Sequence, residues 1–338
     1  MSQLLPTVGV LVPTYPGTPT PPAERPVGRA ALQLREEGVS VLFGDQVFRR
    51  DGQIWMSGLA ALPDRWEPAE RPIAALHDRF PSQRRAAQYR AVLAQLDGLP
   101  MGNPESLTLL CRDKAACQRY LEQSAPTLPM PALVTNPDVF EDHLSAWKAG
   151  FLKPQYGALG VSVQRVHPGD PLPRMLPGVV EGIEEPTILQ RAVAPPPGWA
   201  GRSARVLCQR EPDRRWHQCE PAVRESRDDY VVNAARGATV RPGSQALSPD
   251  AADALHTICQ QTLDALAQHP DGDLLVEVGL DVVFDAAEQP WLIEVNSRPR
   301  GRLEVLAARD PARFAQAHRD ACARPLRALA HWVRDLSI

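Results

Sequence analysis

The chain has 338 residues, of which 43% are hydrophobic and 23% charged, so we expect a globular protein with two or three packed units. A formal net charge of −3 without a basic tail argues against nucleic acid as a partner. No apolar run reaches the roughly 18 residues of a membrane helix, and the N-terminus lacks the pattern of a signal peptide, so we expect a cytoplasmic protein that binds no membrane.

The six cysteines lie outside C-x-x-C pairs and outside the spacings at which cysteine and histidine share zinc. Cysteine is among the residue types most often buried, so we expect free thiols in the core. The 35 prolines punctuate loops and form no long linker. The sequence therefore predicts neither a disulfide framework nor a zinc site.

The first hundred residues alternate between strand and helix patterns. Strands are predicted at 7–13, 39–44 and 72–80, and helices at 28–38 and 82–97. A hairpin is predicted at 46–56, turned by Asp51 and Gly52, a pair that favours two-residue turns. Alternating strands and helices favour a parallel sheet. We therefore expect a Rossmann-like N-terminal domain over residues 1–104.

From residue 105 onward the pattern is α+β with antiparallel strands. Helices are predicted at 108–123, 137–148, 249–268 and 308–335, and strands within 149–166, 187–193, 203–210, 216–226 and 274–296. The fold class is thus α/β plus α+β, with a central lobe over 105–186 and a C-terminal lobe over 187–338. The last helix is amphipathic, and we expect it to pack against the C-terminal lobe.

The hairpin at 274–296 carries three oxygen ligands. Pairing across its loop sets Asp281 opposite residues 293–294, and Glu294 and Asn296 share one face of their strand because they are two residues apart. Two carboxylates and an amide oxygen suit Mg²⁺, and Mn²⁺ could replace it. The alternative is a solvated polar face. The flanking Leu, Ile and Val residues argue against it, because polar groups within so apolar a hairpin need partners.

Lys153 ends an apolar strand and is followed by Gly157 and Gly160. Glycines let the backbone approach a phosphate, and a lysine on the adjacent strand supplies a positive charge. The segment is neither a Walker A motif nor a Rossmann fingerprint, and alone it is also consistent with an ordinary turn. Its position upstream of the hairpin is what favours a phosphate site.

Together these segments resemble the ATP-grasp superfamily, through FLKPQYGALGVSV, ILQRAV and GLDVVF followed by WLIEVNSRP. A narrower resemblance is to the YheC/YheD-like branch, described as spore-coat-associated, and it adds AALHDRFPSQ, GNPESLTLLCRDK and VVNAARGATV. The resemblance covers most of the chain. It implies an ATP-grasp fold, with a Rossmann-like N-terminal domain and two α+β lobes that enclose ATP and Mg²⁺.

The resemblance also implies roles for individual residues. The phosphates would be contacted by Lys114, Lys153, Gly157 and Gly160, the adenine by Gln190, Arg191 and Val193 at a hinge, and the metals by Asp281, Glu294 and Asn296. The catalytic residues would be Arg205 and Arg298, which would face the transferring phosphoryl group or a substrate carboxylate. Asn233 and Gly237 could approach the substrate. Apart from the resemblance, His77 ends a predicted strand and could face the cleft, but we expect it to be exposed or capped. Two departures from the family pattern are Ala204, where the Asp of D-x-R is expected, and Arg300, where a glycine is expected.

The activity implied by the resemblance is that of an ATP-dependent carboxylate–amine ligase acting through an acylphosphate. Its partners would be a small-molecule carboxylate and an amine, with an amino acid or peptide among them. Two alternatives stay open: a phosphotransferase that acts on a hydroxyl, and a non-catalytic coat or structural protein that retains an ATP-binding shell. The sequence gives no indication of the oligomeric state.

Overall fold

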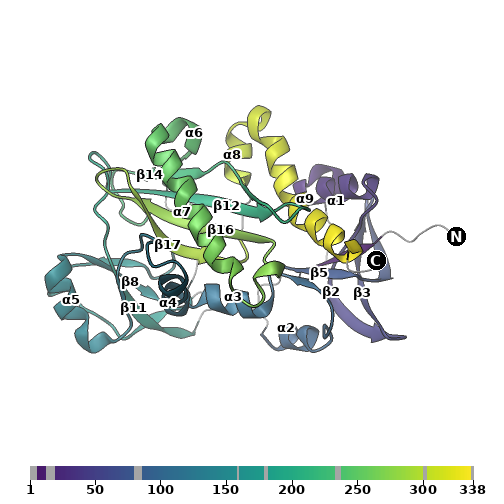
Figure 1. Ribbon diagram of the computed structural model, residues 1–338, viewed down its shortest axis with the longest axis horizontal. Helices are drawn as coiled ribbons and strands as arrows, with labels where there is room; N and C mark the ends of the chain where they lie inside the picture. The colour runs from purple at the N-terminus through teal and green to yellow at the C-terminus, as the bar shows by residue number, and fades with distance from the viewer. Residues whose placement is uncertain are drawn as a thin grey trace.

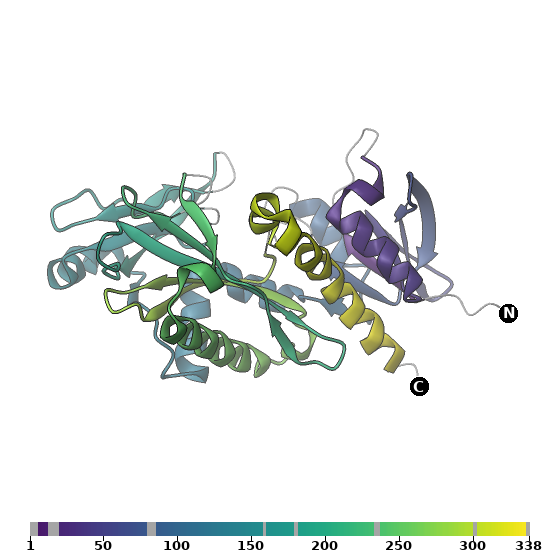
Figure 2. The same cartoon turned by 90° about the horizontal axis from the view of Figure 1, so that it is seen from above.

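The computed structural model describes residues 6–12, 20–79, 86–157, 160–178, 182–232, 237–299 and 303–335. It contains three β-sheets that follow one another along the chain. Figures 1 and 2 show the N-terminal sheet at one end of the molecule and the central sheet at the other. Within the described residues, no helix is long and apolar enough to span a membrane. All six cysteines are free and buried, as predicted.

The N-terminal sheet has the order β4-β3-β2-β1-β5-β6, in which β2, β1, β5 and β6 are parallel and β3 and β4 are antiparallel additions. The elements of this unit are β1 (Thr7–Leu11), a 3₁₀ turn (Pro22–Glu24), α1 (Pro26–Glu36), β2 (Ser40–Arg50), β3 (Gln53–Ala61), β4 (Trp66–Pro72), β5 (Ala75–Asp78), α2 (Ala86–Leu93) and β6 (Met101–Gly102). The β2–β3 hairpin turns at Asp51 and Gly52, whose φ angles of 49° and 76° fit the predicted turn.

The central sheet has the order β10-β11-β8-β9, and β7 also pairs with β11. The elements are β7 (Leu133–Val134), a 3₁₀ turn (Pro137–Val139), α5 (Phe140–Trp147), β8 (Gly150–Pro154), β9 (Gln164–Val166), β10 (Met175–Pro177) and β11 (Glu184–Arg191). Phe140, Leu144, Leu152 and Leu189 form a core of this unit. The boundary expected between residues 186 and 187 falls inside β11, because that strand pairs with β8 in the central sheet.

The C-terminal sheet has the order β15-β14-β12-β16-β17, with β13 paired to β12. Its strands are β12 (Gly201–Arg210), β13 (Trp216–Gln218), β14 (Ala222–Ser226), β15 (Thr239–Pro242), β16 (Glu277–Phe284) and β17 (Pro290–Asn296). The helices around it are α3 (Glu105–Arg112), α4 (Lys114–Ser124), α6 (Gly243–Ala246), α7 (Pro249–Ala267), a 3₁₀ turn (Gly272–Leu274), α8 (Glu304–Arg309) and α9 (Pro311–Asp335).

One helix was expected over 108–123, and the structure has two, α3 and α4. Asp113 leaves the helical conformation, with φ −83° and ψ 98°, and its side chain caps α4 by accepting from the N–H groups of Ala115 and Ala116, each at 3.0 Å. Both helices share the core of the C-terminal sheet with α7. They do not join the central core, although their residues fall in the range expected for the central lobe.

Helix α9 packs on two of the three sheets. Its first half contributes Phe314 and Ala321 to a core with the C-terminal sheet, as expected. Its second half places Leu326, Leu329 and Trp332 in a core with α1, β1 and β2. This second contact was not predicted, and it arises because the N-terminal sheet has an apolar face that α1 alone does not cover.

Asn103 joins the N-terminal unit to the C-terminal sheet. Its side chain is almost fully buried, and its Nδ2 donates to the carbonyl of Glu277 at 2.8 Å and to that of Ser297. Its Oδ1 accepts from the N–H groups of Val276 and Glu277 at 2.9 and 3.2 Å. Because every polar atom of the amide has a backbone partner, Asn103 fixes the base of the β16–β17 hairpin.

The Glu277 carboxylate is fully buried at the same junction. It accepts a hydrogen bond from Arg79, accepts one from Gln209 at 3.0 Å, and lies 3.2 Å from Nε2 of His77. His77 is therefore buried, and the expectation of an exposed or capped histidine is wrong. The sequence could not show this, because the partner carboxylate lies 200 residues away.

We expect Asn103→Ala to lower the free energy of unfolding by about 2–4 kcal/mol, because it leaves several buried backbone groups unpaired and places alanine at a φ of 59°. Urea denaturation measures the change. Asp51→Ala is the matched control, since it also loses a tolerant residue at positive φ but in an exposed turn, and should cost about 1 kcal/mol or less. Equal losses in the two variants would contradict a bridging role for Asn103.

Candidate functional site

The three predicted metal ligands share one face of the β16–β17 hairpin. Asp281 pairs with Glu294, as predicted, and Gly279 pairs with Asn296. The register shifts after Asp281, where Val282 pairs with Leu292, so Ile293 is an extra residue that forms a β-bulge. The bulge lets Leu292 and Val295 both enter the core while Glu294 stays on the face of Asp281. Asn296 Nδ2 donates to Asp281 Oδ2 at 2.8 Å.

Two arginines from neighbouring strands hold the Asp281 carboxylate. Arg205 on β12 lies opposite Asp281 and donates to both carboxylate oxygens, with Nε to Oδ1 at 2.9 Å. Arg224 on β14 approaches Oδ1 with Nη1 at 3.5 Å. Burial alone would raise the pKa of Asp281, but the charge and hydrogen bonds of Arg205, together with the charge of Arg224, lower it. The carboxylate is therefore ionised, and both of its oxygens accept from Arg205.

Arg224 was not predicted as a site residue. It reaches Asp281 because β14 pairs with β12 in the register that sets Arg224 opposite Ser203, on the same face as Arg205. Alternation along the predicted strand at 216–226 could have placed it on one face, but the pairing register is not visible in the sequence. The expectation that Ala204 replaces the Asp of a D-x-R motif is wrong, because that Asp lies two residues before the Arg and corresponds to Ser203. Ala204 points to the opposite face and is fully buried in the core.

Lys153 on β8 is buried and donates from Nζ to Oε1 of Gln190 on β11 at 2.6 Å. Burial, and then the charge of Lys114, lower the pKa of Lys153 from 10.5 to about 8, while Glu294 and Asp281 act in the opposite direction. The pKa of Lys153, a residue of the central sheet, is thus affected by carboxylates of the C-terminal sheet.

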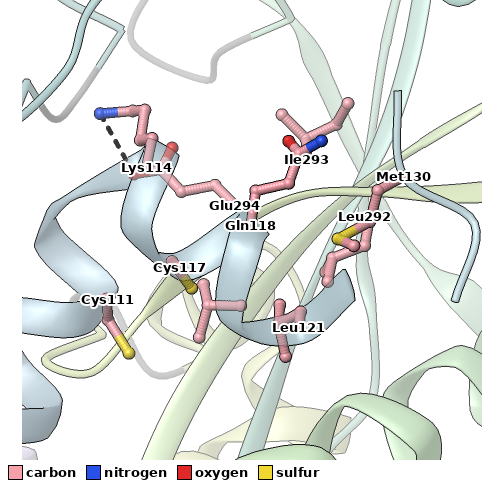
Figure 3. A pocket seen from close by; sticks show the side chains of 10 residues that line it. Cys111, Lys114, Cys117, Gln118, Leu121, Met130, Leu292, Ile293 and Glu294 are labelled. Carbon is pink, nitrogen blue, oxygen red and sulfur yellow. Dashed lines mark ion pairs between the residues drawn. The ribbon is translucent and has the colours of Figure 1, made fainter. Parts of the chain in front are cut away.

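Lys114 links the same two units at the start of α4. Its buried ammonium group donates to the carbonyl of Gly157 and lies 3.9 Å from Oε1 of Glu294. Figure 3 shows Lys114 and Glu294 at the edge of a small cavity lined below by Cys117 and Leu121. Its volume of about 20 Å³ gives room for a water molecule.

Both glycines of the β8–β9 loop occupy positions that disfavour a side chain. A side chain at Gly157 would meet the ring of Pro154 at 2.9 Å, and Gly160 has a φ of 70°. Residues 158–159, between them, lie outside the described part of the chain, as do Asn233 and Arg300.

The other predicted site residues are distributed differently. Gln190 is buried against Lys153, whereas Arg191 is exposed and Val193 half-buried at the end of β11. Arg298 lies at the end of the hairpin, two residues after Asn296. It donates to the buried carboxylate of Asp78 and to the hydroxyl of Tyr89 at 2.6 Å, and so ties the end of the hairpin to the N-terminal unit.

The donor atoms of the hairpin fit a hard cation. Asp281 and Glu294 supply carboxylates and Asn296 an amide oxygen, a set that leaves positions for water and phosphate on Mg²⁺. Among the residues that the structure describes, no cluster of three or more His, Cys, Asp or Glu side chains could hold a metal by itself. Lys114 lies 3.9 Å from Oε1 of Glu294, beyond hydrogen-bond distance.

Residues 200–323 match the family model described as YheC/D-like ATP-grasp. D-alanyl-alanine synthetase A from Vibrio cholerae is a similar solved structure, with 14% identity and a TM-score of 0.53 over 96% of this chain and 99% of that chain. ATP-grasp ligase PsnB complexed with minimal precursor, Mg and ADP has 15% identity and a TM-score of 0.54 over 94% of this chain and 96% of that chain. Macrocyclase MdnC bound with precursor peptide MdnA from Microcystis aeruginosa has 13% identity and a TM-score of 0.55 over 93% of this chain and 98% of that chain. A search of curated proteins gave no match. The predicted ATP-grasp fold is confirmed, and the resemblance to the YheC/D-like branch is confirmed over the matched segment.

We expect Lys153→Met to raise the free energy of unfolding at pH 7 by about 1–3 kcal/mol, because it removes a buried charge at the cost of one hydrogen bond to Gln190. The folded-state pKa of about 8 lies below the unfolded value of 10.5, so the wild type gains stability as the pH rises between them. The difference between the two proteins should therefore narrow toward pH 10. Urea denaturation at both pH values measures it, and a constant difference would contradict the assignment.

Proposed function

We propose that this chain, with its ATP-grasp fold, is an ATP- and Mg²⁺-dependent carboxylate–amine ligase that acts through an acylphosphate. The observation that carries the proposal is the set of cations around the hairpin carboxylates. Lys114 lies 3.9 Å from Glu294 and also donates to the carbonyl of Gly157, just after the strand of Lys153, while Arg205 donates to both oxygens of Asp281. A polyphosphate needs cations on its oxygens and a divalent metal between them, and these residue types supply both needs.

The nucleotide would lie between the central and C-terminal sheets. Lys114 and Lys153 would bind its phosphates, and the backbone around Gly157 and Gly160 would approach them closely. With a pKa of about 8, Lys153 is mostly protonated at neutral pH and carries the charge that a phosphate requires. The adenine would meet the end of β11 at Gln190, Arg191 and Val193, through backbone groups.

Asp281, Glu294 and Asn296 would hold the metal. When bound there, Mg²⁺ would neutralise negative charge on the transferring phosphoryl group. Arg205 now donates to both oxygens of Asp281, so it is held beside the metal site with a planar guanidinium facing it. Arg224 adds a second guanidinium to the same carboxylate. Two arginines on one aspartate leave an excess of positive charge, which favours an anionic substrate group next to the metal.

The reaction would proceed in two displacements. A substrate carboxylate oxygen would bond to the γ-phosphorus of ATP, and ADP would leave. The amine nitrogen would then bond to the acyl carbon, lose a proton, and expel inorganic phosphate. Arg205 and Arg224 would stabilise charge on the phosphoryl and acyl oxygens. Enclosure between the two sheets would keep water from the acylphosphate. Two of the similar structures are a D-alanyl-alanine synthetase and a macrocyclase bound with a precursor peptide, which supports an amino acid or peptide as substrate.

A substrate panel tests the reaction class. The protein is incubated with ATP, Mg²⁺ and pairs of carboxylates and amines, including amino acids and short peptides, and products are followed by ADP release and mass. A ligase joins two substrates with loss of water, whereas a phosphotransferase adds a phosphoryl group to one hydroxyl. Nucleotide binding without turnover across the whole panel would favour a non-catalytic shell.

We expect Glu294→Gln to lower the rate of ADP formation about 100-fold or more, because it removes one of two carboxylates at the metal. The measurement is coupled ADP release at saturating Mg²⁺. Glu122→Gln is the matched control, since Glu122 is exposed on α4, the helix that begins with Lys114. A comparable loss in the control, or full activity in Glu294→Gln, would argue against the metal assignment.

A further inference from the structure

The N-terminal unit and the C-terminal sheet form one connected body. Asn103, the Glu277 cluster and the pair of Arg298 with Asp78 tie them together through buried polar contacts, and α9 packs on both. The central sheet has its own core around Phe140 and Leu152. A separate core on one side of the nucleotide site allows the central unit to move as a body relative to the rest.

One side-chain contact joins the central sheet to a loop of the C-terminal sheet. The guanidinium carbon of Arg165 lies 3.6 Å from the centre of the Tyr230 ring. Arg165 belongs to β9, the strand onto which the chain returns after the loop with Gly157 and Gly160. Tyr230 lies in the loop that follows β14, the strand of Arg224. The contact therefore connects the phosphate-binding side with the substrate side of the proposed site.

Part of the Arg165 guanidinium is buried at this contact. In the described part of the chain, Nε of Arg165 is buried and no hydrogen-bond acceptor reaches it. A cation that gives up water without gaining a hydrogen bond relies on the ring for compensation, and a cation–π contact is strongest when the pair is desolvated. The contact is thus more than a chance approach of two surface side chains.

Residues 228–230 of the loop after β14 are held by local contacts. Ser226 Oγ accepts from the N–H groups of Asp228 and Asp229 at 3.3 and 3.0 Å. The backbone of the loop packs closely on Gly201, where an added Cβ would lie 3.1 Å from the carbonyl oxygen of Tyr230. Residues 228–230 are therefore held by the neighbouring backbone, while Tyr230 itself remains 46% exposed.

We propose that Arg165 and Tyr230 form a clasp that holds the central unit closed over bound nucleotide and slows its release. The inference rests on the proposed nucleotide site for its effect on ligand, but the clasp itself is a contact of the free protein. Opening the central unit separates the guanidinium from the ring and exposes both to water. The clasp residues position the two units and touch no reacting atom.

The test compares Tyr230→Ala with Tyr230→Phe, which keeps the ring and removes only the hydroxyl. The probe is Mg·ADP labelled on its ribose with a fluorophore, displaced by excess ADP in a stopped-flow instrument. We expect Tyr230→Ala and Arg165→Ala each to speed dissociation about 3- to 20-fold, and Tyr230→Phe to stay within about twofold of wild type. The double variant should be no faster than either single one, because both remove the same contact.

Amide hydrogen exchange without nucleotide gives an independent measurement. The clasp predicts faster exchange of β8 and β9 in Tyr230→Ala than in Tyr230→Phe, with β16 and β17 unchanged in both. Equal exchange and equal ADP dissociation in the two variants would overturn the clasp. If the two variants differ in exchange but the wild type does not bind Mg·ADP, the contact between the units is supported and the proposed nucleotide site is rejected.

Discussion

The buried hydrogen bonds of Asn103 fix the position on which the rest of the site depends. They hold the first residues of β16 and the turn after β17, so both ends of the ligand-bearing hairpin are tied to the N-terminal unit. Fully satisfied polar contacts in a low-dielectric interior favour one arrangement over its neighbours, because any shift leaves groups unpaired. These hydrogen bonds therefore also determine where the hairpin holds Asp281, Glu294 and Asn296.

The anchored hairpin also organises charge. Asp281 accepts from Arg205 and from Arg224. Glu294 faces Lys114 and raises the pKa of Lys153, against the effect of burial. Each of these groups is at least partly buried, and burying an ionic group costs free energy that an apolar residue in its place would not cost. Such a cost in stability is typical of sites whose charges are arranged for binding a ligand.

The sequence predicted what depends on local spacing. Glu294 and Asn296 are two residues apart in an apolar strand pattern, and the Asp51–Gly52 turn needs backbone conformations that few residue types adopt. Both features could therefore be predicted from the sequence. Contacts set by strand register or by distant partners could not. Arg224 reaches Asp281 only because of how β14 pairs with β12, and His77 is buried only because Glu277 meets it from 200 residues away. The break at Asp113 carried a local signal, a capping residue inside an apolar pattern.

The packing of α9 bears on the order in which the chain folds as it is synthesised. Residues 103–310 separate β6 from this helix, yet its Leu326, Leu329 and Trp332 complete the core that begins with Val8 and Val10. Until the helix has left the ribosome, the first sheet carries an uncovered apolar face and cannot reach its final state. The unit made first is therefore finished last, and a nascent chain of this protein would depend on protection of that face while the rest is made.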